Sequence, residues 1–244
     1  MKTRTYDTPQ FMGEAAGKLA ALKIEAAIKE NQEANIILAT GASQFHTLNT
    51  LINYEIIDWS RVTVFHLDEY IGIEDNHPAS FRKYLRERFL EKIGKVKCFN
   101  FINGNAQNPQ DECERLNRLI QPLTIQVALV GIGENGHLAF NDPPADFDTE
   151  DPYIIANLDE KCRLQQVGEG WFDGLDDVPR QAISMSIRQI MKSKSIICSV
   201  PDKRKAEAVK ACVLGEVSNL HPASILQKHE DCTVFLDKGS AHFI

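Results

Sequence analysis

Asp68 and Glu69 are adjacent carboxylates at the end of a predicted β-strand. They directly follow the apolar run of residues 62–67. Because successive strand residues point to opposite faces, only one of the two is expected to face a ligand. Partial burial at such a position can bring a carboxyl group to a pKa that is useful for proton transfer. The alternative is that the pair forms a solvated acidic strand end.

A histidine follows another apolar run, within the glycine-rich stretch GIGENGHLAFND of residues 131–142. Glycines let the backbone approach a ligand closely, and His137 is a natural general acid or base near neutral pH. Asn135 and Asp142 flank it, and this setting favours chemistry over a purely structural histidine, which is the alternative. The glycines expected to approach the ligand are Gly131 and Gly133.

A small-residue turn, Thr40-Gly41-Ala42-Ser43, lies between the apolar run of residues 36–39 and a helical segment. A strand that leads through such a turn into a helix exposes unpaired N–H groups and a partial positive charge, which suit a phosphate. Alternatively, Ser43 only caps the helix. The turn matches neither a Walker A loop nor G-x-G-x-x-G, so nucleotide binding has little support.

Lys205 belongs to a basic cluster with Lys203 and Arg204 at the start of a predicted helix. Such clusters usually form a solvated face. Cations at a helix N-terminus oppose the helix dipole, however, which fits better if they hold an anion. Lys205 is therefore a candidate anion ligand.

The elements that must position these residues alternate between strands and helices. This alternation implies parallel crossovers and a three-layer α/β sandwich, Rossmann-like, with a mostly parallel central sheet. Ligands of such sheets bind at the carboxyl ends of the strands. We find neither a linker nor a repeat, so residues 1–244 are expected to form a single domain. The predicted strands are 36–39, 62–67, 98–102, 127–130, 195–200, 233–236 and segments near Ile154 and Ile183; the predicted helices are 8–32, 43–54, 78–93, 109–120 and 202–213.

Composition narrows the class of partner. The 27 basic and 34 acidic residues give a net charge of −7, which weighs against nucleic-acid binding. No apolar stretch resembles a signal or a membrane span, so we expect a cytoplasmic protein without a membrane partner. The six cysteines are scattered without zinc-binding spacing and are expected to be buried, reduced thiols.

The combination of LDEYIG at 67–72, GIGENGHLAFNDP at 131–143 and the TGAS turn at 40–43 resembles the glucosamine-6-phosphate deaminases, also called glucosamine-6-phosphate isomerases. The related 6-phosphogluconolactonases share G-x-G-x-x-G-H but typically have a DER-like motif and lack AFN. The resemblance covers nearly the whole chain. It implies a single-domain fold of the sugar-phosphate isomerase type and conversion of glucosamine 6-phosphate and water to fructose 6-phosphate and ammonia, with neither a metal nor an organic cofactor.

The resemblance also implies roles for the residues. Asp68 is expected to move a proton between C2 and C1, and His137, oriented by Asp142, to open the sugar ring. The partner is thus a small-molecule sugar phosphate. We expect the catalytic group to comprise Asp68, His137, Asn135 and Asp142, and the substrate or phosphate contacts to come from Thr40, Gly41, Ala42, Ser43, Glu69, Gly131, Gly133 and Lys205.

Three positions depart from the family pattern. Asn135 stands where Asp is frequent, so a hydrogen bond is kept while a charge is lost. Asp142 replaces a longer Glu, which predicts a less firmly oriented His137. Ala42 replaces a glycine, which is tolerable only where the backbone does not need a positive φ.

A further departure concerns phosphate binding. The family's second phosphate-binding arginine would fall near Gly170 and is absent, and Arg163 and Arg180 are candidate replacements. These differences leave other functions open: a galactosamine-6-phosphate deaminase, a 6-phosphogluconolactonase, or a sugar-phosphate sensor without catalysis. The chain ends soon after its last strand, so we expect no allosteric activation, and a homo-oligomer stays open because family members range from monomers to hexamers.

Overall fold

A computed structural model describes all residues 1–244 and contains a seven-stranded and a three-stranded β-sheet. The strands are β1 (Lys2–Tyr6), β2 (Ala34–Leu38), β3 (Val62–His66), β4 (Asp68–Tyr70), β5 (Cys98–Asn100), β6 (Val127–Val130), β7 (Tyr153–Asn157), β8 (Gln181–Met185), β9 (Ser195–Val200) and β10 (Cys232–Asp237). The helices are α1 (Pro9–Asn31), α2 (Phe45–Ile52), α3 (Phe81–Leu85), α4 (Glu91–Ile93), α5 (Pro109–Ile120), α6 (Glu160–Gly168), α7 (Ile187–Met191) and α8 (Ala206–Leu214).

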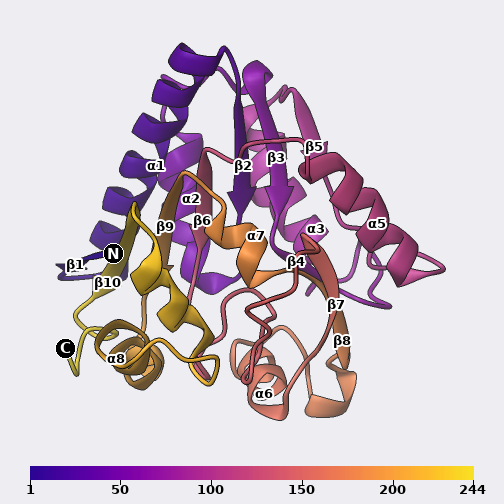
Figure 1. The fold of residues 1–244 in the computed structure, drawn as a ribbon, viewed down its shortest axis with the longest axis vertical. Helices are drawn as coiled ribbons and strands as arrows, with labels where there is room; N and C mark the ends of the chain where they lie inside the picture. Colours follow the sequence, from indigo (N-terminus) through magenta and orange to yellow (C-terminus); the bar gives the residue numbers. More distant parts are fainter.

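The large sheet is parallel throughout, with the strand order β1-β10-β9-β6-β2-β3-β5. From β2 the chain builds outward through β3 and β5, whereas from β6 it builds outward on the other side through β9 and β10. The order therefore reverses between β2 and β6, which is where open α/β sheets bind ligands. The carboxyl ends of β2 and β3 point toward the end of the molecule that holds α6 and α8 (Figure 1).

Helices cover both faces of this sheet. One apolar cluster joins α1 and α2 to one face, and another joins α5, α7 and α8 to the opposite face. Strands β2, β3, β6 and β9 are buried along their whole length, as expected for a parallel sheet that is covered on both sides. The predicted three-layer α/β architecture is confirmed.

The small sheet is antiparallel, with the order β4-β8-β7. Its first strand contains the motif Asp68-Glu69-Tyr70, which follows β3 after the single residue Leu67. The N–H of Leu67 donates to Leu38 in the large sheet, and its carbonyl accepts from Met185 in the small one. Asp68 therefore lies where the two sheets meet.

The sequence patterns missed several elements. β1 was not predicted because it is a polar, largely exposed edge strand that pairs with β10. The helix predicted from residue 78 begins at Phe81, after the Ser80 cap, and includes a π-helical turn at Arg86–Leu90 before α4. Helices α6 and α7 were also missed. All six cysteines are unpaired, and five are buried, but Cys98 is exposed, contrary to expectation.

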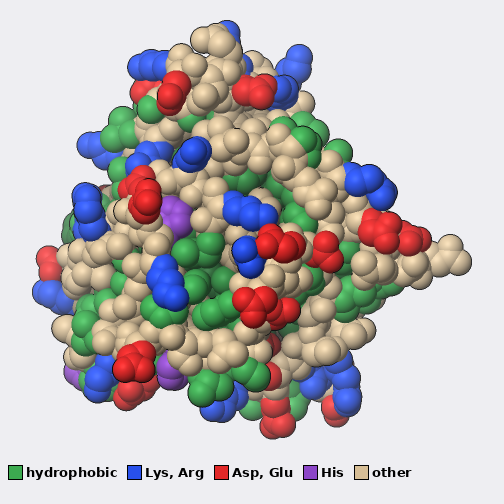
Figure 2. Space-filling view, viewed as in Figure 1, with side chains coloured by type: hydrophobic (Ala, Val, Ile, Leu, Met, Phe, Trp, Pro, Cys, Tyr) green, Lys and Arg blue, Asp and Glu red, His purple; other side chains and the backbone are tan.

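The apolar length of the helices and the distribution of surface charge bear on two kinds of partner, membranes and nucleic acids. None of the helices combines the length and the apolar character that a bilayer crossing requires. Lys and Arg side chains are interspersed with Asp and Glu on the face in Figure 2. This distribution differs from the clustered basic surface on which nucleic-acid binding depends.

Candidate active site

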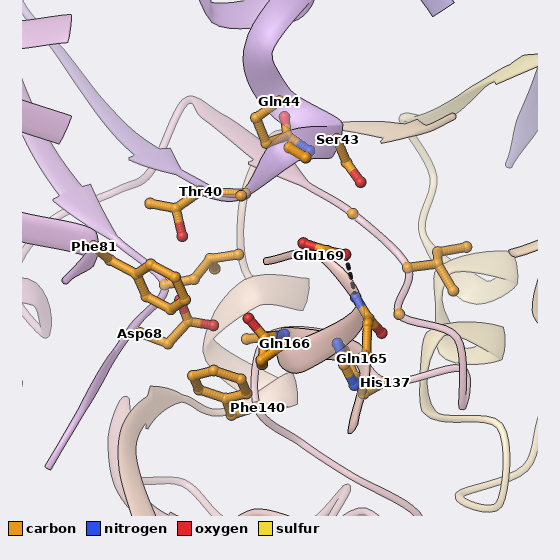
Figure 3. A pocket seen from close by; sticks show the side chains of 18 of the residues that line it. Thr40, Ser43, Gln44, Asp68, Phe81, His137, Phe140, Gln165, Gln166 and Glu169 are labelled. Carbon is orange, nitrogen blue, oxygen red and sulfur yellow. Dashed lines mark hydrogen bonds between the residues drawn. The ribbon is translucent and has the colours of Figure 1, made fainter. Parts of the chain in front are cut away.

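A cavity opens at the carboxyl ends of the parallel strands, with about 580 Å³ of empty space including its mouth. Loops that follow β9, β6, β2 and β3 line it, and these four strands are neighbours in the sheet in this order. Helix α6 and Phe81, the first residue of α3, contribute the remaining wall (Figure 3). The predicted site residues that line the cavity are Thr40, Gly41, Ala42, Ser43, Asp68, Gly131, Gly133, His137 and Lys205.

The Asp68 side chain reaches the cavity, yet the residue is only 7% exposed. Burial, and then the charge of neighbouring Glu69, raise the pKa of its carboxyl group to about 8. A carboxyl group with such a pKa is well matched to accepting and returning a proton near neutral pH.

Glu69 points away from the cavity, which corrects its predicted role in substrate binding. It is fully buried, and its carboxylate accepts hydrogen bonds from Ser80 Oγ at 2.8 Å and from the backbone N–H of Arg82 at 2.9 Å. The Arg82 side chain also forms an ion pair with it at 3.3 Å. Glu69 therefore anchors the start of α3 to β4, as the opposite orientation of adjacent strand residues requires.

The His137 ring is fixed from two sides. Its Nδ1 lies 3.1 Å from Asp142 Oδ1. A Cβ atom on Gly133 would come within 2.1 Å of Nε2, so this position has room only for glycine. Although burial opposes it, hydrogen bonding from His137 holds the pKa of Asp142 below its ordinary value. An ionised Asp142 can only accept, so Nδ1 donates and Nε2 is left for proton transfer.

Asn135 and Asp142 do not line the cavity; both are hydrogen-bonded to His137 and hold it in position. Asn135 Nδ2 donates to Asp142 at 2.9 Å and to Asp159 at 3.0 Å, and its Oδ1 accepts from the His137 N–H at 3.0 Å. Asp159 also caps α6. Two carboxylate partners explain why an amide stands at position 135.

The other end of the cavity suits an anion. Lys205 is 4% exposed, and its Nζ donates to Ser43 Oγ at 2.6 Å. Burial lowers the pKa of this ammonium. Gly41 has a φ of +86°, whereas Ala42 does not have a positive φ. Alanine in place of the family's glycine at residue 42 is therefore sterically tolerable. The turn and the lysine thus lie together, as the prediction of an anion site requires.

Helix α6 brings three polar residues to the cavity that the sequence patterns did not single out. Gln166 is held by Tyr70, whose hydroxyl donates to Gln166 Oε1 at 2.8 Å. Gln165 Oε1 accepts from the Glu134 N–H at 2.9 Å, and Glu169 follows the helix. The buried face of α6 is itself polar, which explains why periodicity missed it. Asp159, with Glu160 after it, was the usable signal for a helix start.

The candidate replacements for the absent phosphate-binding arginine do not reach the cavity. The Arg163 guanidinium donates to the carbonyl oxygens of Leu175 and Val178. Arg180 precedes β8, is exposed and is not among the lining residues. Lys205 is consequently the only Lys or Arg among the lining residues.

One group of side chains has the composition of a metal site. Potential ligand atoms of His137, Asp142 and Cys162 lie within 4.8 Å of one another. His137 and Asp142 are already hydrogen-bonded to each other, and burial, aided by the Asp142 charge, raises the pKa of the Cys162 thiol well above its ordinary value. Metal binding needs the thiolate, so this set does not fit a resident metal ion.

Comparisons with known proteins agree with this geometry. Residues 7–235 match the sequence profile of the family described as glucosamine-6-phosphate isomerases/6-phosphogluconolactonase. The chain is 34% identical to the glucosamine-6-phosphate deaminase of Clostridium acetobutylicum over 100% of both chains. It is 34% identical to glucosamine-6-phosphate deaminase 1 of Bacillus subtilis, over 99% of this chain and 98% of the relative.

Solved structures show the same relationship. The structure of a monomeric glucosamine-6-phosphate deaminase superimposes with a TM-score of 0.89 at 32% identity and covers 100% of both chains. A 6-phosphogluconolactonase from Trypanosoma brucei superimposes with a TM-score of 0.82 at 18% identity, over 99% of this chain and 97% of that one. The second similarity is one of fold alone.

Proposed function

Because this chain belongs to the family of glucosamine-6-phosphate isomerases and 6-phosphogluconolactonases, we propose that it is a glucosamine-6-phosphate deaminase. The reaction converts glucosamine 6-phosphate and water to fructose 6-phosphate and ammonia. One observation carries the proposal: Asp68, with its raised pKa, and His137, oriented by Asp142, line the same cavity as the Lys205 anion site.

His137 would open the sugar ring. With Nδ1 donating to Asp142, the free Nε2 accepts the proton of the O1 hydroxyl and returns it to the ring oxygen. The C1–O5 bond breaks as the C1 carbonyl forms. The C2 proton is acidic in the open-chain amino aldehyde, because the neighbouring C1 carbonyl group accepts the electron pair of the C2–H bond.

Asp68 would then act as the base. Its carboxylate takes the proton from C2, the C2–H electron pair forms the C1=C2 bond, and the C2 ammonium gives a proton to O1, so that a neutral amine remains at C2. The Asp68 carboxyl group then returns the proton to C1, which leaves an iminium group at C2. Water adds to C2 and ammonia departs, so the ketone of fructose 6-phosphate forms.

The anion site would position the reacting carbons. The backbone N–H groups of the Thr40–Ser43 turn and the Lys205 ammonium bind the phosphate at C6. Holding this remote group fixes C1 and C2 with respect to Asp68 and His137, so the binding energy contributes to the rate as well as to affinity.

The direct test is the release of ammonia and fructose 6-phosphate from glucosamine 6-phosphate. We expect the two products in equal amounts. Faster turnover of galactosamine 6-phosphate would identify that sugar as the substrate, and accelerated opening of 6-phosphogluconolactone without ammonia release would favour a lactonase. Thermal stabilisation by sugar phosphates without turnover of any of them would indicate a sensor.

We also propose that residues 1–244 act as one domain in the cytoplasm. Both sheets contribute to the walls of a single cavity, and the six unpaired cysteines fit a reducing compartment.

A further inference from the structure

A carboxylate stands in the cavity opposite the anion site. Glu169, directly after α6, projects toward the middle of the cavity (Figure 3). Its Oε1 accepts from Gln165 Nε2 at 2.8 Å, and its Oε2 accepts from Trp171 Nε1 at 3.2 Å. Both donors are neutral. The side chain is therefore fixed in place by neutral donors, and the cations that interact with its charge, Lys205 and Arg204, form no direct ion pair with it.

Glu169 faces the residues that would bind phosphate. Its Oε2 lies 4.0 Å from the point where a Cβ atom on Gly41 would stand. Glu169 is also the charge that most strongly opposes the effect of burial on the Lys205 ammonium. Since Lys205 is the only Lys or Arg in the lining, this carboxylate offsets much of the positive potential available to an anion.

The consequence is a preference based on ligand charge. A phosphate bound to the turn is repelled by Glu169, whatever sugar carries it. A ligand that also carries an ammonium group recovers part of this cost, because that cation is attracted by Glu169 across the same low-dielectric cavity. A sugar phosphate without an ammonium group has no such compensation.

We propose that Glu169 is a specificity-determining residue that favours sugar phosphates carrying a protonated amine over sugar phosphates without one. The inference rests on the proposed deaminase function and extends it to product release. Once the amine has left as ammonia, the remaining sugar phosphate belongs to the disfavoured class, so the same carboxylate promotes its departure.

A matched pair of ligands tests this role without turnover. Glucitol 6-phosphate and 2-amino-2-deoxyglucitol 6-phosphate have the same open chain and differ only at C2. Calorimetric titration gives their dissociation constants for the wild type and for Glu169→Gln, which keeps an acceptor for Gln165 and removes the charge. We expect glucitol 6-phosphate to bind about five- to tenfold tighter to the variant and the amine to gain about twofold or less.

The control is Glu160→Gln, which removes an exposed carboxylate from the same helix outside the substrate cavity. It should change neither affinity, and added salt should shrink the effect of Glu169→Gln. Glu169→Ala should shift the selectivity in the same direction. Equal tightening of both ligands, no change, or weaker binding of both would overturn the proposal. Turnover of glucosamine 6-phosphate by the same wild-type preparation is measured separately, because its absence contradicts the deaminase function and not the charge preference.

Discussion

The two walls of the cavity are built differently. The segments that directly follow β3, β6 and β9 hold Asp68, His137 and Lys205, and these three strands are buried along their whole length. The wall formed by α6 holds Gln165 and Glu169, which are tied to their neighbours by side-chain hydrogen bonds. The first wall holds the groups for proton transfer in fixed positions. The second wall offers polar side chains that can select among ligands. Substitutions of Asp68, His137 or Lys205 should therefore lower kcat, and substitutions on the α6 wall should change the relative affinities for different ligands.

The largest effect on kcat is expected at Asp68, in β4 just after β3. Asp68→Asn removes the proposed base and should lower kcat about 10³-fold, within the range for general-base catalysis. The measurement is steady-state release of ammonia. Binding of 2-amino-2-deoxyglucitol 6-phosphate serves as the control, because it should persist if the cavity is intact. Normal kcat in this variant would remove Asp68 from the mechanism.

Loss of the anion ligand is expected to come next. Lys205→Met keeps most of the side-chain volume and removes the ammonium that bonds Ser43. We expect kcat/KM to fall about 10²-fold, with kcat falling as well as KM rising, since phosphate binding positions the reacting carbons. An effect confined to KM would show that the phosphate contributes only affinity.

The pH profile tests the environment of Asp68. Only the carboxylate form can accept the C2 proton, so activity should rise with pH until this group is ionised. Below the pKa of about 8, kcat/KM should fall about tenfold per pH unit. Glu69→Gln removes the like charge beside Asp68 and should move this limb to lower pH. A limb that stays in place would assign the titration to the substrate amine instead.

A smaller effect is expected behind His137. Asn135→Asp places a third carboxylate against Asp142 and Asp159, to both of which the amide now donates. We expect the free energy of unfolding to fall by about 1–3 kcal/mol at pH 7. Chemical denaturation measures this change. The matched variant Asn105→Asp, on an exposed turn, should leave stability nearly unchanged.

The sequence predicted the large sheet well, because strands that are buried on both faces appear as short apolar runs. It also predicted that residues from the turn at 40–43, Asp68, His137 and Lys205 share one edge, since parallel strands end together. β1 and α6 escaped prediction because one is exposed and the other buries glutamines. Their structure depends on tertiary hydrogen bonds that local periodicity does not reveal.

The incorrect prediction that Glu69 contacts the substrate also arose because tertiary hydrogen bonds decide its orientation. The alternation along a strand predicts that one of two adjacent carboxylates faces the ligand, but it does not tell which. Ser80 and Arg82 decide this, because their donors surround the Glu69 carboxylate. They lie more than ten residues further along the chain, so the choice became visible only in the folded structure.

In the proposed mechanism, Asp68 removes the C2 proton of a sugar phosphate that is held by the Lys205 end of the cavity. Proton NMR of glucosamine 6-phosphate in D2O follows the C2–H signal directly, with wild type and Asp68→Asn compared at equal occupancy. We expect the signal to disappear with the wild type as product forms and to persist with the variant. Loss of C2–H at the wild-type rate with Asp68→Asn would contradict this mechanism.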